Sequence, residues 1–246
     1  MGVRVRKATP PQPSPSPKAK GRETTTETRM QPDFWHQRWA DNQIGFHQSA
    51  PTTLLLKHWP AVGVATGATV FVPLCGKSLD MAWLASQGHQ VLGVELSQLA
   101  VEQFFAEHDL MPEIHASQYG THYRAGGIEI IHGDAFGLDA EVLADCSAVF
   151  DRAAMIALPP QMHARYAAEV YARLPTGCRG LLITLEYAQA EREGPPFAIS
   201  EGEVREQYAS SWQVELLERR PIPAGHPGFV SGVSKLDTSV YGLQRR

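Results

Sequence analysis

The segment that most constrains the fold of this chain runs from residue 70 to residue 95, VFVPLCGKSLDMAWLASQGHQVLGVE. It begins with an apolar run that predicts a buried strand, and a short turn with one glycine follows. An apolar helical pattern comes next and is closed by a second glycine. A second apolar run then ends on Glu95. This strand–turn–helix–strand order, with an acid about 20 residues after the first turn, is the layout of a nucleoside-binding crossover.

Glu95 is the first candidate binding residue. A carboxylate can accept hydrogen bonds from two neighbouring hydroxyls, so an acid at this position suits a ribose. The alternative interpretation is a solvated carboxylate at the end of a strand, with no ligand.

The turn after the first strand lacks the two common phosphate-binding patterns. The tripeptide GKS at 76–78 looks like the end of a phosphate loop, but Phe71 stands where that loop needs a glycine. The glycine-spaced dinucleotide pattern is also absent, because Val72, Leu74 and Lys77 occupy the turn. With one glycine the backbone can approach a pyrophosphate at few positions, which disfavours ATP and NAD. A cofactor with ribose and adenine but no phosphate, such as S-adenosylmethionine, fits better.

Composition places the chain among globular proteins of one sizeable domain, with 246 residues of which 43% are apolar. No run approaches about 20 apolar residues, so no membrane partner is expected. Cys75, Cys146 and Cys178 show no C-x-x-C spacing, which suits a reducing compartment and predicts a cytoplasmic protein. The ten histidines form no motif such as H-E-x-x-H, so no metal is expected.

Charge divides the chain at residue 30. Residues 1–29 hold seven of the 22 basic residues and two of the 26 acidic ones, so the remainder, 30–246, has 15 basic and 24 acidic residues. An acidic body argues against nucleic acid as a partner. The extension 1–29 is rich in Pro, Ser and Thr and is predicted to be disordered, with a basic binding arm as the alternative. It lacks the apolar core of a secretory signal, and we expect the folded domain to span 30–246.

Three aromatic residues precede the first strand. Trp35 and Trp39 lie four apart on a helix predicted from Pro32 to Asp41, so they share one face, and Phe46 follows in a loop. They could fix the N-terminal segment onto the core. They could also form a lid in which an indole face meets adenine or a sulfonium.

The rest of the chain alternates strands and helices. Further strands are predicted at 128–131, 148–150 and 181–185, and alternating segments at 212–218 and 238–243 predict an antiparallel addition at one edge. Residues 111–127 are predicted to be rich in loops. Ser97 and the Ser200–Glu203 capping box predict helix starts. The pattern predicts an α/β protein with a seven-stranded, mostly parallel, doubly wound sheet.

One acidic and one basic residue follow the third and fourth predicted strands. Asp134 is placed to meet an adenine amino group, or else it is a turn or N-cap aspartate. Arg152 could pair with Asp134 or Asp151, or could bind an anionic ligand.

Several segments together resemble the thiopurine S-methyltransferase family in its bacterial form. They are PDFWHQRWADNQIGFHQ, VFVPLCGKSLDMAWLASQGHQVLGVELS, GDAF and FDRAAMIALPP, and the resemblance runs from Met30 to the C-terminus. It implies the fold of the S-adenosylmethionine-dependent methyltransferases, and an aromatic at Phe46 lining the acceptor pocket. It also implies a set of cofactor-binding residues, namely Trp39, Leu74, Glu95, Asp134, Ala135 and Arg152. The 29-residue extension departs from the bacterial pattern.

The resemblance implies methyl transfer from S-adenosylmethionine to the sulfur of thiopurines or other aromatic thiols, by a monomer. Bacterial members also imply methylation of selenium and tellurium compounds. The sequence shows no nucleophile–base pair, so no catalytic residue is assigned. Two alternatives remain, a methyltransferase with a halide or oxygen acceptor and a non-catalytic nucleotide-binding protein.

Overall fold

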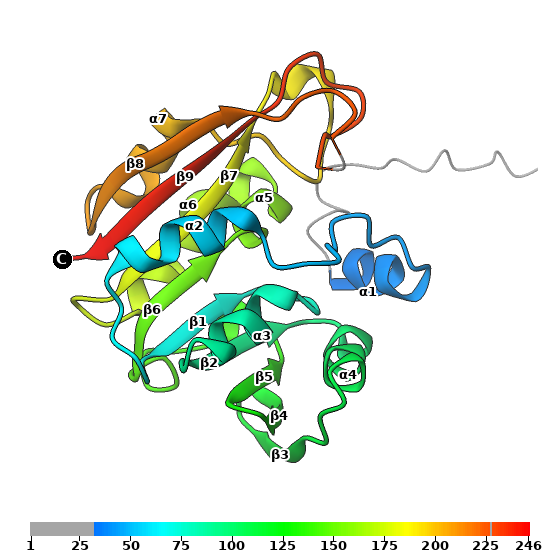
Figure 1. The fold of residues 1–246 in the computed structure, drawn as a ribbon, viewed down its shortest axis with the longest axis vertical. Helices are drawn as coiled ribbons and strands as arrows, with labels where there is room; N and C mark the ends of the chain where they lie inside the picture. Colours follow the sequence, from blue (N-terminus) through cyan, green and yellow to red (C-terminus); the bar gives the residue numbers. More distant parts are fainter. Residues whose placement is uncertain (1–31, 227) are drawn as a thin grey trace, which may run out of the picture.

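The computed structural model describes residues 32–226 and 228–246, so the predicted extension 1–29 and its boundary at residue 30 lie outside the described residues. The described chain is built around one nine-stranded sheet (Figure 1). The strands are β1 (Thr69–Pro73), β2 (Gln90–Glu95), β3 (Glu113–Ser117), β4 (Gly120–Ala125), β5 (Ile128–His132), β6 (Cys146–Asp151), β7 (Arg179–Glu186), β8 (Trp212–Pro221) and β9 (Asp237–Arg245). The helices are α1 (Pro32–Ala40), α2 (Thr53–Val62), α3 (Leu79–Ser86), α4 (Gln98–Glu107), α5 (Ala154–Ala157), α6 (Pro160–Glu169) and α7 (Glu201–Tyr208), with 3-10 turns η2 (Ala135–Gly137), η3 (Tyr171–Arg173) and η4 (Gln189–Glu191).

The strand order in the sheet is β3-β4-β5-β2-β1-β6-β7-β9-β8. The five strands from β5 to β7 pair in parallel, and the strands at both edges pair antiparallel. The order reverses between β1 and β6, which is the kind of position where ligands bind at the carboxyl ends of the strands. The predicted fold class and the antiparallel C-terminal addition are confirmed.

The sheet has two strands more than the sequence predicted, because the segment 111–127 contains the hairpin β3–β4 and not mainly loops. Every residue of β3 is exposed, so this strand carries no alternation of apolar and polar residues. The turn of the hairpin needs a glycine, because Gly120 has φ +134 and a Cβ there would lie 2.1 Å from the His132 carbonyl oxygen.

Helices cover both faces of the sheet. On one face α2, α3 and α4 contribute to a core cluster through residues such as Leu55, Met81 and Phe104, and on the other face α6 and α7 contribute Tyr166 and Tyr208. Burying each such side chain stabilises the fold by about 1.5–3 kcal/mol. Two apolar layers against one sheet explain why the central strands read as continuous apolar runs.

Two helix starts follow their predicted caps. The Ser97 hydroxyl oxygen accepts from the Ala100 N–H at 3.3 Å, and that of Ser200 accepts from the Glu203 N–H at 3.2 Å. The Glu203 carboxylate contacts buried His163 at 2.6 Å and so connects α7 to α6. Among the described residues no helix is long and apolar enough to cross a membrane.

Candidate functional site

The turn after β1 is held against the end of β2. The Cys75 N–H donates to the Val94 carbonyl oxygen at 3.0 Å. Gly93 allows this approach, because a Cβ there would lie 2.8 Å from the Cys75 Sγ. Leu74 adopts φ +47, a left-handed conformation that costs a non-glycine residue about 1–2 kcal/mol. Such strain at the carboxyl end of a central strand is typical of a functional turn.

Glu95 is buried at the end of β2, with 7% of its surface exposed, so the solvated alternative is wrong. Its two carboxylate oxygens accept from the N–H groups of Gly76 and Ser97, each at 2.8 Å. Burial raises the pKa of Glu95, and the hydrogen bonds from the backbone act in the opposite direction. Because a carboxylate offers about four lone-pair sites, this one can still accept from ligand hydroxyls.

The N-terminal aromatic residues cover this turn. Trp39 is 4% exposed, and its indole lies against Gly76, where a Cβ would be 3.1 Å from the ring. Phe46 is 40% exposed and makes edge contacts with both Trp35 and Trp39, at centroid distances of 6.0 and 5.7 Å. Trp39 and Glu95 therefore meet on the same glycine. The segment both packs on the core and covers the carboxyl edge of the sheet, so the two sequence interpretations are compatible.

Arg152, at the end of β6, is held by a residue that the sequence did not single out. Its Nε lies 3.2 Å from an oxygen of Asp80, and its Nη1 donates to the Gln48 side-chain oxygen at 2.6 Å. Asp80 is 1% exposed and also accepts from the Thr52 N–H at 2.7 Å. Asp80 thus links α3, β6 and the segment before α2. Its signal in the sequence was an acid in the first turn of the helix that follows the glycine turn.

The two acids expected to pair with Arg152, Asp151 and Asp134, make other contacts. Asp151 is buried and accepts from the hydroxyls of Tyr166 and Tyr171 at 2.8 and 3.0 Å. Burial raises the pKa of Asp151, and these hydrogen bonds oppose that shift. Asp134 caps η2, since its Oδ1 accepts from the Phe136 N–H at 3.0 Å.

Asp134 follows β5, the strand that pairs with the one ending at Glu95. Its neighbour Gly133 donates its N–H to the Glu95 carbonyl oxygen at 2.9 Å. The Asp134 side chain is exposed, whereas Ala135 is buried. The structure thus brings the turns after β1, β2 and β5 together at one edge, with Arg152 following β6 at the same edge.

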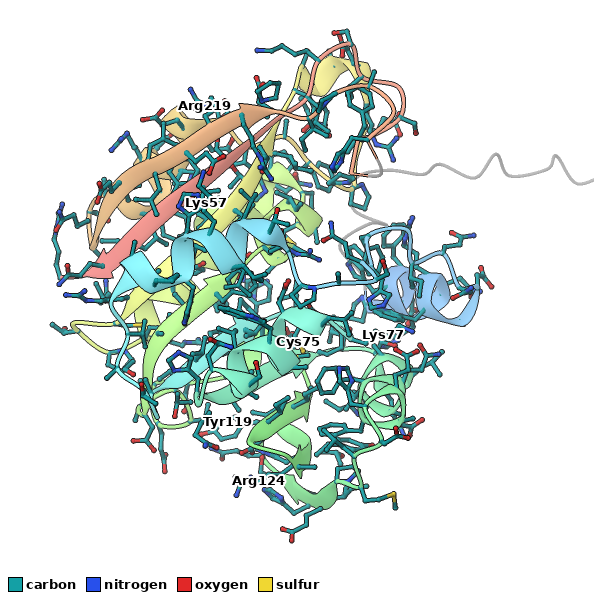
Figure 2. The ribbon with its side chains drawn as sticks, viewed as in Figure 1. Lys57, Cys75, Lys77, Tyr119, Arg124 and Arg219 are labelled. Carbon is teal, nitrogen blue, oxygen red and sulfur yellow. The ribbon has the colours of Figure 1, made fainter. Side chains whose placement is uncertain are left out.

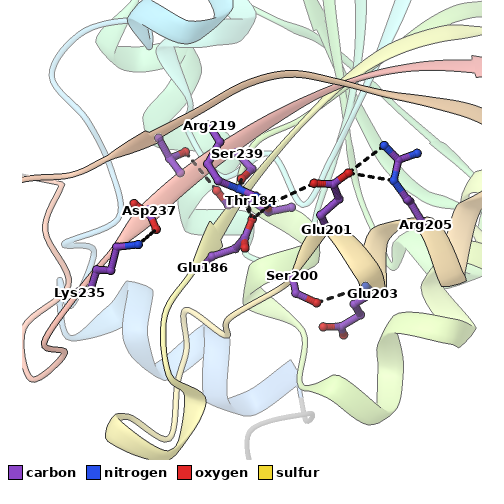
Figure 3. Close-up of polar contacts among 11 residues, drawn as sticks. Thr184, Glu186, Ser200, Glu201, Glu203, Arg205, Arg219, Lys235, Asp237 and Ser239 are labelled. Atoms are coloured by element: carbon purple, nitrogen blue, oxygen red, sulfur yellow. Dashed lines mark hydrogen bonds and ion pairs between the residues drawn. The ribbon is translucent and has the colours of Figure 1, made fainter.

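Two other charged side chains near this edge, Lys77 and Glu186, form ion pairs within the protein. The Lys77 ammonium lies 2.5 Å from a carboxylate oxygen of Glu107 on α4, and Figure 2 labels Lys77 and Cys75 in the same turn. At the end of β7, Glu186 accepts from Arg219 at 2.9 Å and from the Ser239 hydroxyl at 2.7 Å (Figure 3). Lys77 and Glu186 are each paired within the protein.

A hollow of about 480 Å³ lies at the opposite end of the sheet. It is lined by the first residues of four strands, namely Thr69, Gln90, Ile128 and Cys146. In parallel sheets ligands gather at the carboxyl ends, so we place the candidate site at the edge that contains Glu95.

Comparison with solved structures shows the fold class. The 1,6-didemethyltoxoflavin-N1-methyltransferase of Burkholderia thailandensis aligns with a TM-score of 0.56 at 15% identity, over 95% of this chain and 94% of that one. This similarity shows the fold of the class I S-adenosylmethionine-dependent methyltransferases.

The sequence places the chain within that class. The model of the thiopurine S-methyltransferase family matches residues 30–246. The thiopurine S-methyltransferase of Nitrosomonas eutropha is 56% identical over 217 residues, which is 88% of this chain and 99% of the relative. That of Xanthomonas campestris pathovar campestris is 57% identical over 217 residues, 88% of this chain and 100% of the relative. The chain belongs to the thiopurine S-methyltransferase family and is an S-adenosylmethionine-dependent S-methyltransferase.

Proposed function

We propose that this enzyme transfers the methyl group of S-adenosylmethionine to the sulfur of thiopurines or of other aromatic and heterocyclic thiols. One observation carries the proposal: the Glu95 carboxylate and the Trp39 indole meet on the same glycine, Gly76, at the carboxyl end of the central strands. This places an acceptor for hydroxyl groups beside an aromatic surface, which is what a cofactor with a ribose and a sulfonium requires.

Each candidate residue then has a distinct role. Glu95 binds the ribose hydroxyls, and the strained turn at Leu74 exposes backbone to the donor. Trp39 offers its ring to the sulfonium, and Phe46 lines the acceptor pocket. Arg152 orients the donor carboxylate or an anionic acceptor.

Asp134 and Ala135 bind the adenine. The exposed Asp134 carboxylate has an oxygen that does not cap η2 and can accept from the adenine amino group. This role is compatible with its capping role, because the two roles use different oxygens.

The reaction needs alignment more than proton transfer. The acceptor sulfur, as its thiolate, attacks the methyl carbon in line, a new carbon–sulfur bond forms, and the carbon–sulfur bond of the sulfonium breaks. The products are a thioether and S-adenosylhomocysteine, and the thiol proton has already passed to solvent. A thiopurine sulfur ionises easily, so no general base is required. Holding the two reactants in line can lower the barrier by up to about 7–11 kcal/mol.

The acceptor is identified by a labelled-methyl assay across thiopurines, thiophenols, selenite and tellurite. We expect transfer to the aromatic thiols, and transfer to the selenium and tellurium compounds would extend the proposal to other soft chalcogen acceptors. Inert thiols with an active halide or oxygen acceptor would overturn it. Binding of the donor without transfer to any acceptor would favour a non-catalytic binding protein.

The role of Arg152 has its own test. Arg152→Ala should weaken binding of the donor or of an anionic acceptor, measured as dissociation and Michaelis constants for each. Unchanged constants for both would refute the role. We also propose that the enzyme is a cytoplasmic monomer, for which light scattering on the full chain tests the mass.

A further inference from the structure

A cluster of metal-ligand side chains lies on the edge hairpin β3–β4 and the adjoining strand β5. His115 on β3, His122 on β4 and Glu129 on β5 each offer one ligand atom, and these atoms lie within 4.8 Å of one another. His115 and His122 are directly opposite in the antiparallel pair, with ring centroids 4.5 Å apart. Figure 2 shows this hairpin, on which Arg124 is labelled.

Each ring nitrogen of His122 has one partner, and Nδ1 faces the cluster. Its Nε2 lies 2.6 Å from the Ser117 hydroxyl oxygen, and its Nδ1 lies 2.5 Å from a carboxylate oxygen of Glu129. Without an ion, Nδ1–H donates to the Glu129 oxygen and Nε2 accepts from the Ser117 hydroxyl; when an ion binds, Nδ1 gives up its proton to coordinate it, and Nε2–H donates to Ser117. Metal-bound histidines usually donate their other ring N–H to such a partner, which fixes the ring.

The carboxylate is also prepared as a ligand. The Arg124 guanidinium pairs with one oxygen of Glu129 through both Nε and Nη2, which holds the carboxylate in place. Arg124 contacts the Oε2 atom of Glu129, whereas His122 contacts its Oε1 atom. The Oε1 atom therefore faces the two histidines and can act as the ligand. Glu129 also lines the 480 Å³ hollow, and His115 is exposed, so an ion can enter.

We propose that His115, His122 and Glu129 bind a divalent transition ion of the zinc class, with water completing the shell. Two imidazoles and one carboxylate are a donor set that Zn²⁺ accepts, at about 2.0–2.2 Å from each atom. Binding an ion at that radius replaces the 2.5 Å contact between His122 and Glu129, and requires His115 to turn inward. Because the ligands come from three strands, the ion would fasten the edge strands β3 and β4 to β5. No sequence motif marks this site, since its ligands lie seven residues apart in three strands.

The tag-free full chain is first stripped of metal with a chelator. It is then titrated with ZnCl2 in competition with that chelator. His115→Ala is the main variant, because His115 is exposed and its loss should leave the fold intact. The matched control is His226→Ala, an exposed histidine outside the cluster. Loss of an outer-shell partner already weakens metal binding about 10–100-fold, so loss of a direct ligand should weaken it at least tenfold.

We expect one zinc per wild-type chain, binding at least tenfold weaker in His115→Ala, and no change in His226→Ala. Zinc should raise Tm of the wild type and not of His115→Ala. Glu129→Gln should behave like His115→Ala. The three cysteines are buried and do not compete. Absence of zinc binding to the wild type, or equal affinity in His115→Ala, would overturn the proposal and leave an ordinary His–Glu ion pair.

Discussion

At the scale of single residues, Gly76 is the position on which the candidate site depends. Its N–H donates a hydrogen bond to the Glu95 carboxylate, and the Trp39 indole packs where a Cβ would lie. Its φ is +53, in the left-handed region. Gly76→Ala should lower stability by about 1–2 kcal/mol through the left-handed conformation. It should also weaken binding of S-adenosylhomocysteine, because the new Cβ would displace the indole. Urea unfolding and equilibrium dialysis measure the two effects.

Gly177→Ala is the matched control for that variant. Gly177 has φ +83, but a Cβ there would meet nothing within 4 Å. It should therefore lower stability to a similar extent and leave the affinity for S-adenosylhomocysteine unchanged. If both alanine variants bound the ligand like the wild type, contact between Gly76 and Trp39 would have no part in binding.

The role of Trp39 can be tested by removing the indole. Trp39→Phe keeps an apolar ring in a buried position and so spares much of the packing. Cation–π contacts contribute about 0.5–2 kcal/mol and are strongest with Trp, so Phe keeps part of this energy and the loss of affinity stays below about thirtyfold. We expect Trp39→Phe to weaken binding of the charged donor more than binding of its neutral-sulfur product. An equal loss for both ligands would exclude a sulfonium contact.

At the scale of elements, Asp80 connects α3, β6 and the segment before α2 through Arg152 and Thr52. Asp80→Asn removes a buried charge partner, which should cost about 3 kcal/mol, at the lower end of the range for such pairs because Arg152 is partly exposed. The Michaelis constant for the donor should also rise in Asp80→Asn. Glu169→Gln breaks the exposed Arg165–Glu169 pair and should cost less than about 0.5 kcal/mol. Equal stability losses in the two variants would contradict this.

The carboxyl group of Asp151 gives a prediction on pH. Burial raises its pKa, so the folded state keeps this proton to higher pH than the unfolded state. Its contribution to stability is then complete below the unfolded pKa of about 4 and is lost as pH rises through the folded value. We expect the unfolding free energy of the wild type, relative to Asp151→Asn, to fall from pH 4 toward neutrality. A constant or rising difference would show that burial does not dominate.

The sequence predicted the elements with strong apolar periodicity and missed those without it. The five parallel strands and β9 were predicted because they bury at least one face, and β8 because its first half alternates between exposed residues and buried or half-buried ones. The strand β3 was missed, because all of its side chains are exposed. The convergence of Trp39 and Glu95 on one glycine and the ion pair between Asp80 and Arg152 join segments far apart in the chain, and no local pattern encodes such distances.

At the scale of the whole molecule, the nine-stranded sheet separates two regions with different chemistry. The carboxyl ends of the central strands form the candidate donor site, and the residues of the His115–His122–Glu129 cluster come from β3, β4 and β5. Figure 1 shows these three strands at one edge of the sheet. One strand, β5, lies between the hairpin and β2, which ends at Glu95, and none of the three cluster residues is assigned to the donor site. We therefore expect methyl transfer by the chelator-stripped enzyme to equal that of the zinc-loaded enzyme, as rate assays on both forms would show.

The most direct measurement is equilibrium dialysis of the full chain against labelled S-adenosylhomocysteine, repeated with Glu95→Gln. A carboxamide cannot accept both backbone hydrogen bonds and the ribose hydroxyls as the carboxylate does. Losing one charge-assisted hydrogen bond costs about 1.5–3 kcal/mol, or roughly ten- to a hundredfold in affinity. We expect saturable binding of one ligand per wild-type chain and that loss in the variant. No binding to the wild type, or equal affinity in Glu95→Gln, would contradict a donor site built on Glu95.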